Sequence, residues 1–110
     1  EVTITRHPDG CVLIFPRAVW IALKAKLMKL PYSARVLRRI LIGSAVDVKA
    51  DGSGRLLIPN ELRCLCGLTR EVALMGLGDH FELWDQAALA EFEKKELAKD
   101  FSETIEDFVL

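Results

Sequence analysis

Two short runs of apolar residues open the chain. "VTIT" and "CVLIF" are rich in the β-branched and aromatic residues that favour strands, and "RHPDG" between them consists largely of turn formers. The pattern predicts a β-hairpin over residues 2–15. Pro16 then begins a helix, because in "RAVWIALKAKLMKL" large apolar residues recur at steps of three and four with lysines between them. We expect this amphipathic helix to end near Pro31.

A second helix is predicted over residues 34–43, "ARVLRRILIG", with Ser33 as its N-terminal cap and Gly43 at its end. Its basic residues share one face, which we interpret as solvated or subunit-facing, with phosphate contact as the less favoured alternative: Arg35, Arg38 and Arg39. Its apolar residues line another face: Leu37, Ile40 and Leu41.

The middle of the chain alternates with a period of two. "SAVDVKA" is typical of a half-buried strand, "DGSG" of a turn, and "RLLI" of a second strand that Pro59 ends. Asn60 is expected to cap a short helix, "ELRCLCG". Two further strands follow, "EVALMG" and "HFELW", and Asp85 is expected to cap a last helix. That helix would bury Leu89, Phe92 and Leu97.

The strand pair and the helix after it occur twice. "EVTI", a turn, "CVLIFP" and a helix match "EVAL", a turn, "HFELWD" and a helix, at an offset of about seventy residues. Residues 44–70 precede the second copy, so the repeat leads us to expect a lost N-terminal piece of roughly thirty residues before the first. It divides the chain into 1–43, the remainder of a first repeat; 44–100, a second repeat; and 101–110, an acidic tail that is either frayed or a docking segment.

Composition bounds the class of protein. A chain of 110 residues that is 51% hydrophobic can bury one modest core, in which Trp20 and Trp84 are the expected anchors. Charged residues interrupt every long apolar stretch, so no membrane span is predicted, and the start lacks a secretory pattern, which favours the cytoplasm.

The charges are unevenly distributed along the chain. Residues 1–70 hold twelve Lys or Arg against five Asp or Glu, and residues 71–110 hold three against eleven. A solvated face is the commoner cause, but this asymmetry also hints at a nucleic-acid surface.

Candidate catalytic and metal-binding groups are sparse. We interpret the three cysteines as small buried hydrophobes, since Cys64 and Cys66 would point about 200° apart on a helix. His7 and His80 each lie near a turn without a partner at ligand spacing. Ser53 lacks the spacing of a nucleophile elbow. The sequence therefore predicts no enzyme, no metal and no cofactor.

Several stretches in order carry a resemblance to a known family: "TRHPDGCVLIFP", "LIGSAVDV", "DGSGRLLIPNELR", "GLTREVALMG" and "FELWD". From Glu1 to about Ala90 the chain resembles the MraZ family of bacterial transcriptional regulators, relatives of the AbrB-type swapped-hairpin domains. Asp51-Gly-Ser-Gly-Arg55 matches the Asp-x-x-x-Arg turn that this family carries in each of two tandem copies, and the first copy of the turn is missing here. The resemblance implies an α+β fold of tandem swapped-hairpin β-barrel units with short and amphipathic helices.

The same resemblance implies a function. The expected protein binds double-stranded DNA at direct repeats in the promoter upstream of the division and cell-wall gene cluster, in the cytoplasm over the nucleoid. It would do so as a ring-like homo-oligomer, an octamer or a dodecamer in the intact protein. The alternative is a swapped-hairpin protein-interaction or antitoxin-like module that does not bind DNA specifically.

The candidate DNA-binding residues lie in and beside the glycine-rich turn. Gly52 and Gly54 carry no Cβ, so the turn could approach a phosphate backbone closely, and its exposed N–H groups, including that of Ser53, could contact phosphate. Arg55 presents a planar fork that can pair with guanine O6 and N7 or with a phosphate. Asp51 could hold that fork through a charge-assisted hydrogen bond.

Lys49 completes the candidate set. By the two-residue period of a strand it shares a side with Asp51, which makes it a candidate phosphate contact. On the motif alone, an Arg55 that merely pairs with Asp51 to fix a hairpin is the simpler interpretation, because aspartate is common in turns. The family resemblance reverses that preference in favour of DNA contact.

Overall fold

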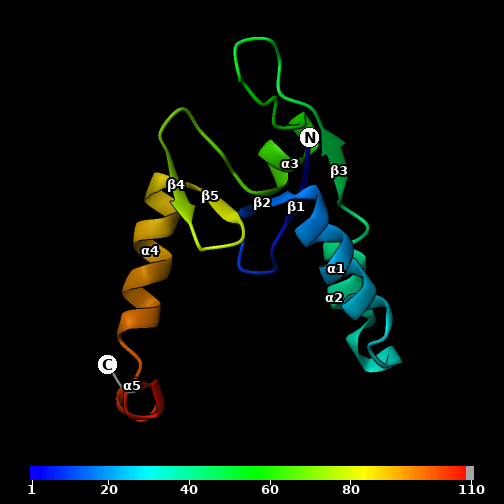
Figure 1. The fold of residues 1–110 in the computed structure, drawn as a ribbon. Coiled ribbons are helices and arrows are strands. Elements are labelled where there is room, and N and C mark those ends of the chain that lie inside the picture. The colour runs from blue at the N-terminus through cyan, green and yellow to red at the C-terminus, as the bar shows by residue number, and fades with distance from the viewer. Residues whose placement is uncertain (109–110) are drawn as a thin grey trace.

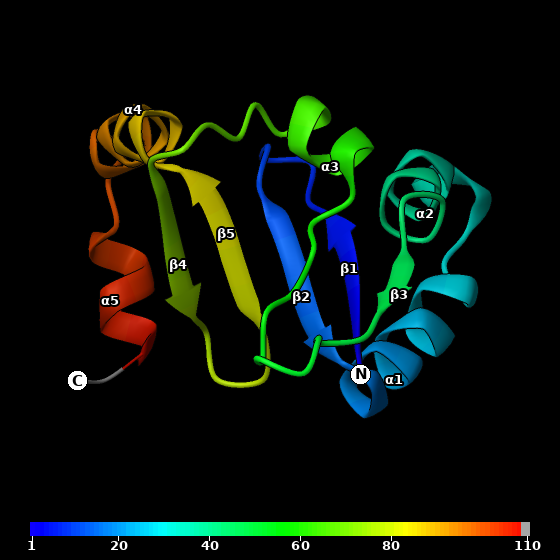
Figure 2. The ribbon, with the colours of Figure 1, turned by 90° about the horizontal axis from the view of Figure 1, so that it is seen from above.

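A computed structural model describes residues 1–108 and contains one five-stranded antiparallel sheet of order β3-β1-β2-β5-β4 (Figures 1 and 2). The strands are β1 (Val2–Arg6), β2 (Val12–Pro16), β3 (Val46–Val48), β4 (Val72–Gly76) and β5 (Phe81–Asp85). The two predicted hairpins, β1–β2 and β4–β5, are both present and join through β2 and β5. Mixed α and β structure is thus confirmed, while the swapped-hairpin barrel stays a prediction.

Two helical arms extend from one side of this sheet. They are built from α1 (Arg17–Met28), the 3-10 helix η1 (Tyr32–Ala34), α2 (Arg35–Leu41), α4 (Gln86–Leu97) and α5 (Ser102–Phe108). α1 and α2 form one arm, and α4 and α5 form the other, so that the molecule has the outline of an arch in Figure 1. The short helix α3 (Asn60–Leu65) lies against the opposite face of the sheet.

The internal repeat is visible in the order of the elements. β1, β2 and α1 succeed one another as β4, β5 and α4 do, and both helices are twelve residues long. The first pairs of the two hairpins, Val2 with Pro16 and Val72 with Asp85, occupy equivalent places. The surroundings differ, because β3 pairs with the outer edge of β1, whereas no strand within residues 1–108 pairs with the outer edge of β4.

The core has two parts because the central hairpin is buried on both faces. Alternate residues of β2 and its turn point to opposite sides, as a pleated strand requires. Cys11, Leu13 and Phe15 join a cluster with both tryptophans under α1 and α2, while Val12 and Ile14 meet α3 on the other face. The predicted core anchors are confirmed: Trp20 is 4% exposed and Trp84 is 3% exposed.

The predicted strand over residues 55–58 is wrong. This segment is extended but pairs with no strand; it crosses the face of the sheet, where Leu56 and Ile58 pack against the cluster around Ile4. A period of two appears equally in a segment that packs on a sheet and in one that pairs within it. β3 is also shorter than expected and ends at Val48.

Two of the three predicted caps are wrong. Ser33 lies inside the 3-10 helix, and Asn60 is already the first residue of α3, where its side chain accepts a hydrogen bond from Arg63. Neither α2 nor α3 has a side-chain cap. Asp85 is confirmed, since its carboxylate accepts the Ala88 N–H at 3.1 Å. Helix starts that follow a proline or a 3-10 turn are already shaped by the chain before them, so a capping side chain is not needed there.

Two buried positions were also wrongly predicted. Cys64 is exposed, although Cys11 and Cys66 are buried as expected. Leu97 is 73% exposed, because α4 leaves the sheet before its last turn. Within residues 1–108, no helix combines the length and the apolar character needed to cross a membrane.

Leu62 is the residue by which α3 is anchored to the sheet, and its side chain is 3% exposed. Leu62→Ala should lower the free energy of unfolding by about 2–5 kcal/mol, because it removes a buried side chain and leaves a cavity. Leu65→Ala in the same helix is the matched control: Leu65 is 51% exposed, so its loss should stay within about 0.5 kcal/mol. Urea unfolding followed by tryptophan fluorescence measures both, and equal losses would show that α3 is not fastened through Leu62.

Candidate nucleic-acid interface

The predicted DNA-binding residues lie in the connection between β3 and α3. In Figure 1 this loop projects from the sheet on the side opposite to the two helical arms. Residues 49–55 are all exposed. The loop is the part of the molecule that stands farthest from the arms, so its tip is accessible to a large partner.

The carboxylate of Asp51 organises the tip. Its Oδ1 accepts the N–H groups of Ser53 and Arg55, both at 2.9 Å. The backbone closes the same turn: Asp51 N–H donates to the Arg55 carbonyl at 2.9 Å, and Gly54 N–H donates to the Asp51 carbonyl at 3.0 Å. A short turn without flanking strands is therefore held by four hydrogen bonds centred on one residue.

These bonds change the expected role of the backbone. The N–H groups of Ser53, Gly54 and Arg55 all donate within the turn, which leaves the Gly52 N–H as the one in the turn with no acceptor among the described residues. The expectation that several N–H groups of the turn are available for phosphate is therefore wrong. The turn is better described as a rigid support for side chains than as an anion nest.

Only one of the two glycines in the turn is required by its backbone conformation. Gly54 has a φ of +79°, a left-handed conformation that other residues adopt at a cost. Gly52 has no such requirement, and a Cβ built there would meet nothing within 4 Å. No contact among the described residues thus accounts for glycine at position 52, which fits a surface that another molecule approaches closely.

Arg55 is held at one end and exposed at the other. Its Nε donates to Asp51 Oδ2 at 3.1 Å, so the predicted contact between the two side chains is present. The Arg55 side chain is nevertheless 78% exposed, and its two Nη groups donate to no atom within residues 1–108. The guanidinium therefore keeps the two donors that recognise a guanine edge or a phosphate bidentately.

The pKa of the Asp51 carboxyl lies below its ordinary value. The N–H group of Arg55 contributes most to the lowering and that of Ser53 comes next, while the Arg55 guanidinium contributes less. The carboxylate is thus stabilised mainly by the fold of the turn and only secondarily by the ion pair. The Arg55 guanidinium is thus the smallest of the three contributions that lower this pKa.

A polar network around one buried hydroxyl fixes the strand from which the loop departs. Thr3 in β1 is fully buried, and its hydroxyl donates to Asp47 Oδ1 in β3 at 2.9 Å. Arg17 at the start of α1 donates to the same carboxylate oxygen. Sequence reasoning missed this network, because residues 3, 17 and 47 come together only through the pairing of β1 with β3.

Lys49 is exposed, but it does not share one side of a strand with Asp51 as predicted. β3 ends at Val48, so the two-residue period of a strand does not extend to Lys49 and Asp51. Lys49 remains within two residues of the turn, on the segment that leads into it. Its contact with phosphate is a prediction that rests on this proximity.

Two of the three arginines of α2, Arg35 and Arg38, make contacts within the helical arm that α1 and α2 form. Arg38 donates to the Leu30 carbonyl at 2.6 Å, and the Arg35 guanidinium lies 4.5 Å from the centre of the Tyr32 ring. Both contacts close the connection between α1 and α2. They favour a structural role over phosphate contact for these two residues.

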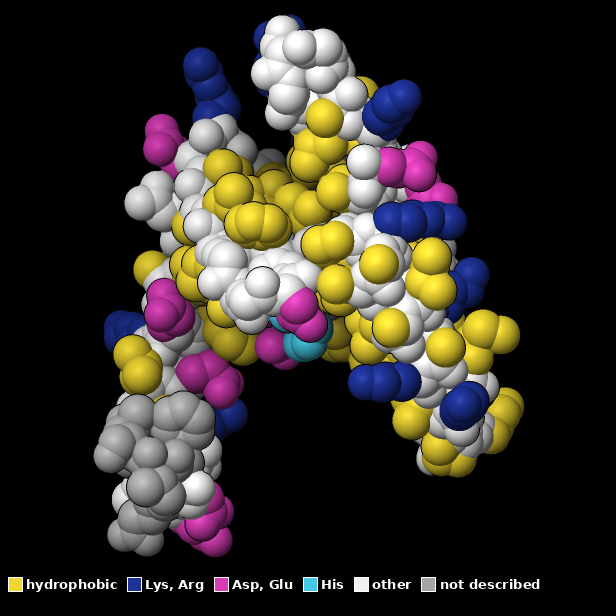
Figure 3. Space-filling model, viewed as in Figure 1, with side chains coloured by type: hydrophobic (Ala, Val, Ile, Leu, Met, Phe, Trp, Pro, Cys, Tyr) yellow, Lys and Arg dark blue, Asp and Glu magenta, His cyan; other side chains and the backbone are white. Residues whose placement is uncertain are grey.

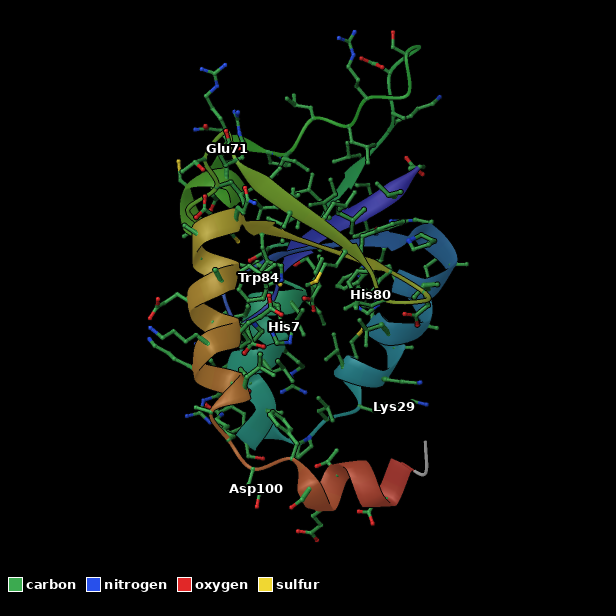
Figure 4. The ribbon with its side chains drawn as sticks, turned by 90° about the vertical axis from the view of Figure 1, so that its left-hand side faces the viewer. His7, Lys29, Glu71, His80, Trp84 and Asp100 are labelled. Atoms are coloured by element: carbon green, nitrogen blue, oxygen red, sulfur yellow. The ribbon has the colours of Figure 1, made fainter. Side chains whose placement is uncertain are left out.

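The histidines lie at the far side of the sheet, each at the turn of a hairpin (Figure 4). His80 pairs with Asp79 at 2.6 Å and stacks on Phe15, and His7 pairs with Asp9 at 3.4 Å. Within the described residues there is no group of three or more His, Cys, Asp or Glu arranged to hold a metal ion. Burial raises the pKa of the Cys11 thiol to about 12, so that thiol is unsuited to nucleophilic chemistry.

The fold and the turn define a small α+β protein with a repeated hairpin–helix unit and a rigid, arginine-bearing turn. A family model described as "MraZ protein, putative antitoxin-like" matches residues 41–110. Proteins named "Transcriptional regulator MraZ" from Herminiimonas arsenicoxydans and Bordetella pertussis are each 50% identical over 98% of this chain and 76% of their own length. The protein of that name from Delftia acidovorans is 44% identical over the same shares. The chain belongs to the MraZ family.

The order of contributions at Asp51 gives a test of the turn. In Arg55→Ala the Asp51 pKa should remain lowered, since the two backbone N–H groups persist and only the smaller guanidinium contribution is lost. Because the folded pKa is lowered, Asp51 stabilises the fold above the pKa of the unfolded chain, and this stabilisation is lost as the pH falls through the folded pKa. NMR titration of the side-chain carboxyl, with the urea-unfolded protein as reference, measures the shift. A return of the mutant pKa to the unfolded value would mean that the ion pair, not the backbone, holds the carboxylate.

Proposed function

We propose that this protein is a DNA-binding transcriptional regulator and that the Asp51–Arg55 turn is the element that contacts DNA. Its relatives are named as transcriptional regulators, which supports a role in transcription rather than catalysis. One observation carries the proposal: Arg55 is fastened through Nε to a rigid turn while its side chain remains 78% exposed. An arginine that only stabilised the turn would not need to be held so far out of the protein.

Each residue of the turn would have a separate role in DNA binding. Arg55 reads a guanine edge or clamps a phosphate with its two Nη groups, and Asp51 keeps the fork oriented before binding. Gly52 permits close approach and offers its N–H, and Ser53 adds a hydroxyl at the tip between Gly52 and Gly54. Lys49 neutralises a phosphate beside the turn.

One turn of this size is too small to bind tightly by itself. Several turns in a ring-like homo-oligomer, engaging direct repeats spaced by about one helical turn of DNA, would supply the missing affinity through linked contacts. The MraZ resemblance points to repeats upstream of the division and cell-wall gene cluster as the target. Such a regulator would act in the cytoplasm, associated with the nucleoid.

The second candidate is a protein-interaction or antitoxin-like module, which the wording of the matching family model favours. In that case the exposed turn would meet an acidic protein surface instead of DNA. Binding to duplex DNA in electrophoretic shifts at two salt concentrations separates the two functions. A regulator of the proposed kind binds the promoter repeats more weakly as salt rises, whereas an antitoxin-like module gives no specific shift at either concentration.

Replacement of Arg55 tests the central contact. Arg55→Ala should weaken binding to the promoter repeats by about 1–3 kcal/mol per engaged site, with folding retained, because the fork and its charge are both lost. Arg55→Lys is the matched control: it keeps the charge but not the planar fork, so it should also lose discrimination against changed guanines. Operator affinity equal to that of the parent in Arg55→Ala would leave this residue with a structural role only.

Replacement of Lys49 tests the phosphate contact. Lys49→Ala should lower affinity for all DNA sequences alike and reduce the slope of log affinity against log salt by about 1. Lys95→Ala, which removes the same charge from exposed α4, should leave the slope unchanged. A slope unaffected by Lys49→Ala would remove this residue from the interface.

A further inference from the structure

A cleft lies between α1, β3 and the residues that join α2 to β3. Its volume is about 410 Å³, which is within the range of small-molecule sites, about 300–1,000 Å³. The residues that line it include none of the loop over residues 49–55. The cleft is therefore separate from the turn that we propose contacts DNA.

Most of the wall of this cleft is apolar. Its apolar lining residues are Trp20, Ile21, Ala25, Met28, Ile42 and Ala45. Two of them are large side chains that face water, since Ile21 is 56% exposed and Met28 is 64% exposed. In Figure 3 the arm that α1 and α2 form shows hydrophobic and basic side chains together. The apolar body of a ligand would remove part of this surface from water.

The charge that the cleft offers to a ligand is positive. The charged residues that line it are Arg17, Lys24 and Asp47. The Asp47 carboxylate is already engaged, because it accepts hydrogen bonds from Thr3 and from Arg17. Lys24 forms no ion pair with any described residue. Residues 17–41 hold seven Lys or Arg and no Asp or Glu, so nothing on this arm offsets that charge.

Arg17 keeps one edge of its guanidinium free. Its Nη1 donates to Asp47 Oδ1 and, at 3.3 Å, to the Thr3 hydroxyl. Nε and Nη2 lie side by side on the other edge and donate to no atom within residues 1–108. Two parallel N–H groups of this kind match a carboxylate, whose two oxygens accept both at once.

Trp20 supplies a further donor, although only 4% of this residue is exposed. Its indole N–H donates to no atom among the described residues, whereas that of Trp84 donates to Glu82 at 2.9 Å. No fully buried polar side-chain atom in the described part of the chain lacks a partner, so the Trp20 N–H must reach an opening. The cleft is the opening that Trp20 lines. An N–H at this depth gains most from an acceptor that enters the cleft.

We infer that this cleft binds a small carboxylate with an aromatic or branched aliphatic body. The carboxylate accepts the free edge of Arg17 and lies beside the ammonium group of Lys24, and the indole N–H of Trp20 donates to an oxygen of the ligand. The apolar body packs against Ile21 and Met28. All three polar groups are donors without an acceptor of their own, so a neutral or cationic ligand of the same shape is rejected. Binding at this site does not depend on the proposed function.

Titration with hydrocinnamate tests the site on the isotope-labelled chain. NMR at about 0.15 M salt, where distant charges are screened, should show a saturable shift of the Trp20 indole N–H signal. The Trp84 signal should stay in place, because Trp84 does not line the cleft. The neutral hydrocinnamamide has nearly the same shape and should bind at least about tenfold more weakly, because it cannot form the charge-assisted hydrogen bonds.

Two variants of α1 locate the binding site. Lys24→Glu places a negative charge beside the carboxylate and should weaken hydrocinnamate binding at least about tenfold. Lys29→Glu is the matched control, because it makes the same change of charge at an exposed residue outside the cleft and should leave the affinity nearly unchanged. Ala25→Phe fills the cleft without changing any charge and should abolish binding. Position 25 is exposed, so the fold should persist, and an unchanged Trp84 signal verifies this.

Several results would overturn the inference. They are the absence of a saturable Trp20 shift, an equal shift of the Trp84 signal, equal binding of the amide, and unaffected binding in either Lys24→Glu or Ala25→Phe. A Trp20 signal that moves on dilution of the protein but not with hydrocinnamate would show that another copy of the chain covers the cleft. Since no sample contains DNA, each of these failures is distinct from a failure of the turn to bind the promoter repeats.

Discussion

Burial of the β1–β2 hairpin on both faces and both edges is the constraint on which this molecule depends. β3 pairs with one edge and β5 with the other, while α1 and α2 cover one face and α3 covers the second. Thr3 and Thr5 are fully buried in this hairpin, and their hydroxyl groups donate to Asp47 and to the Leu41 carbonyl. Each of these polar contacts ties a distant part of the chain to β1, because an unpaired hydroxyl at this depth would be costly. The contact between Thr3 and Asp47 holds β3 in place and so determines where the loop that carries Arg55 begins.

The parts of the fold that sequence reasoning predicted are those determined locally. Both hairpins follow from strand-forming runs around turn residues, and α1, α4 and the Asp85 cap follow from periodicity and capping chemistry. The errors arose where a pattern has two physical causes. The side chains of residues 55–58 alternate between exposed and partly buried because this segment packs against the face of the sheet and is not one of its strands.

In the candidate site, too, the local contacts could be predicted from the sequence and the long-range contacts could not. The contact of Asp51 with Arg55 spans four residues and could be predicted from spacing alone. The contacts of Thr3 and Arg17 with Asp47 could not, since they depend on which strand joins the edge of β1. The hydrogen bonds that the turn's N–H groups donate within the turn could not be predicted either, because the same sequence could form a turn that exposes these groups.

The turn and the two arms stand on opposite sides of the sheet, and this separation has a consequence for gene control. In a homo-oligomer of the kind proposed above, contacts made on the side of the arms would leave each turn uncovered, so the number of turns available to DNA would grow with the size of the assembly. Occupancy of a promoter would then rise as a high power of the protein concentration. A cell could pass from an unoccupied to an occupied promoter over a narrow range of protein levels, with no ligand or modification acting on the protein.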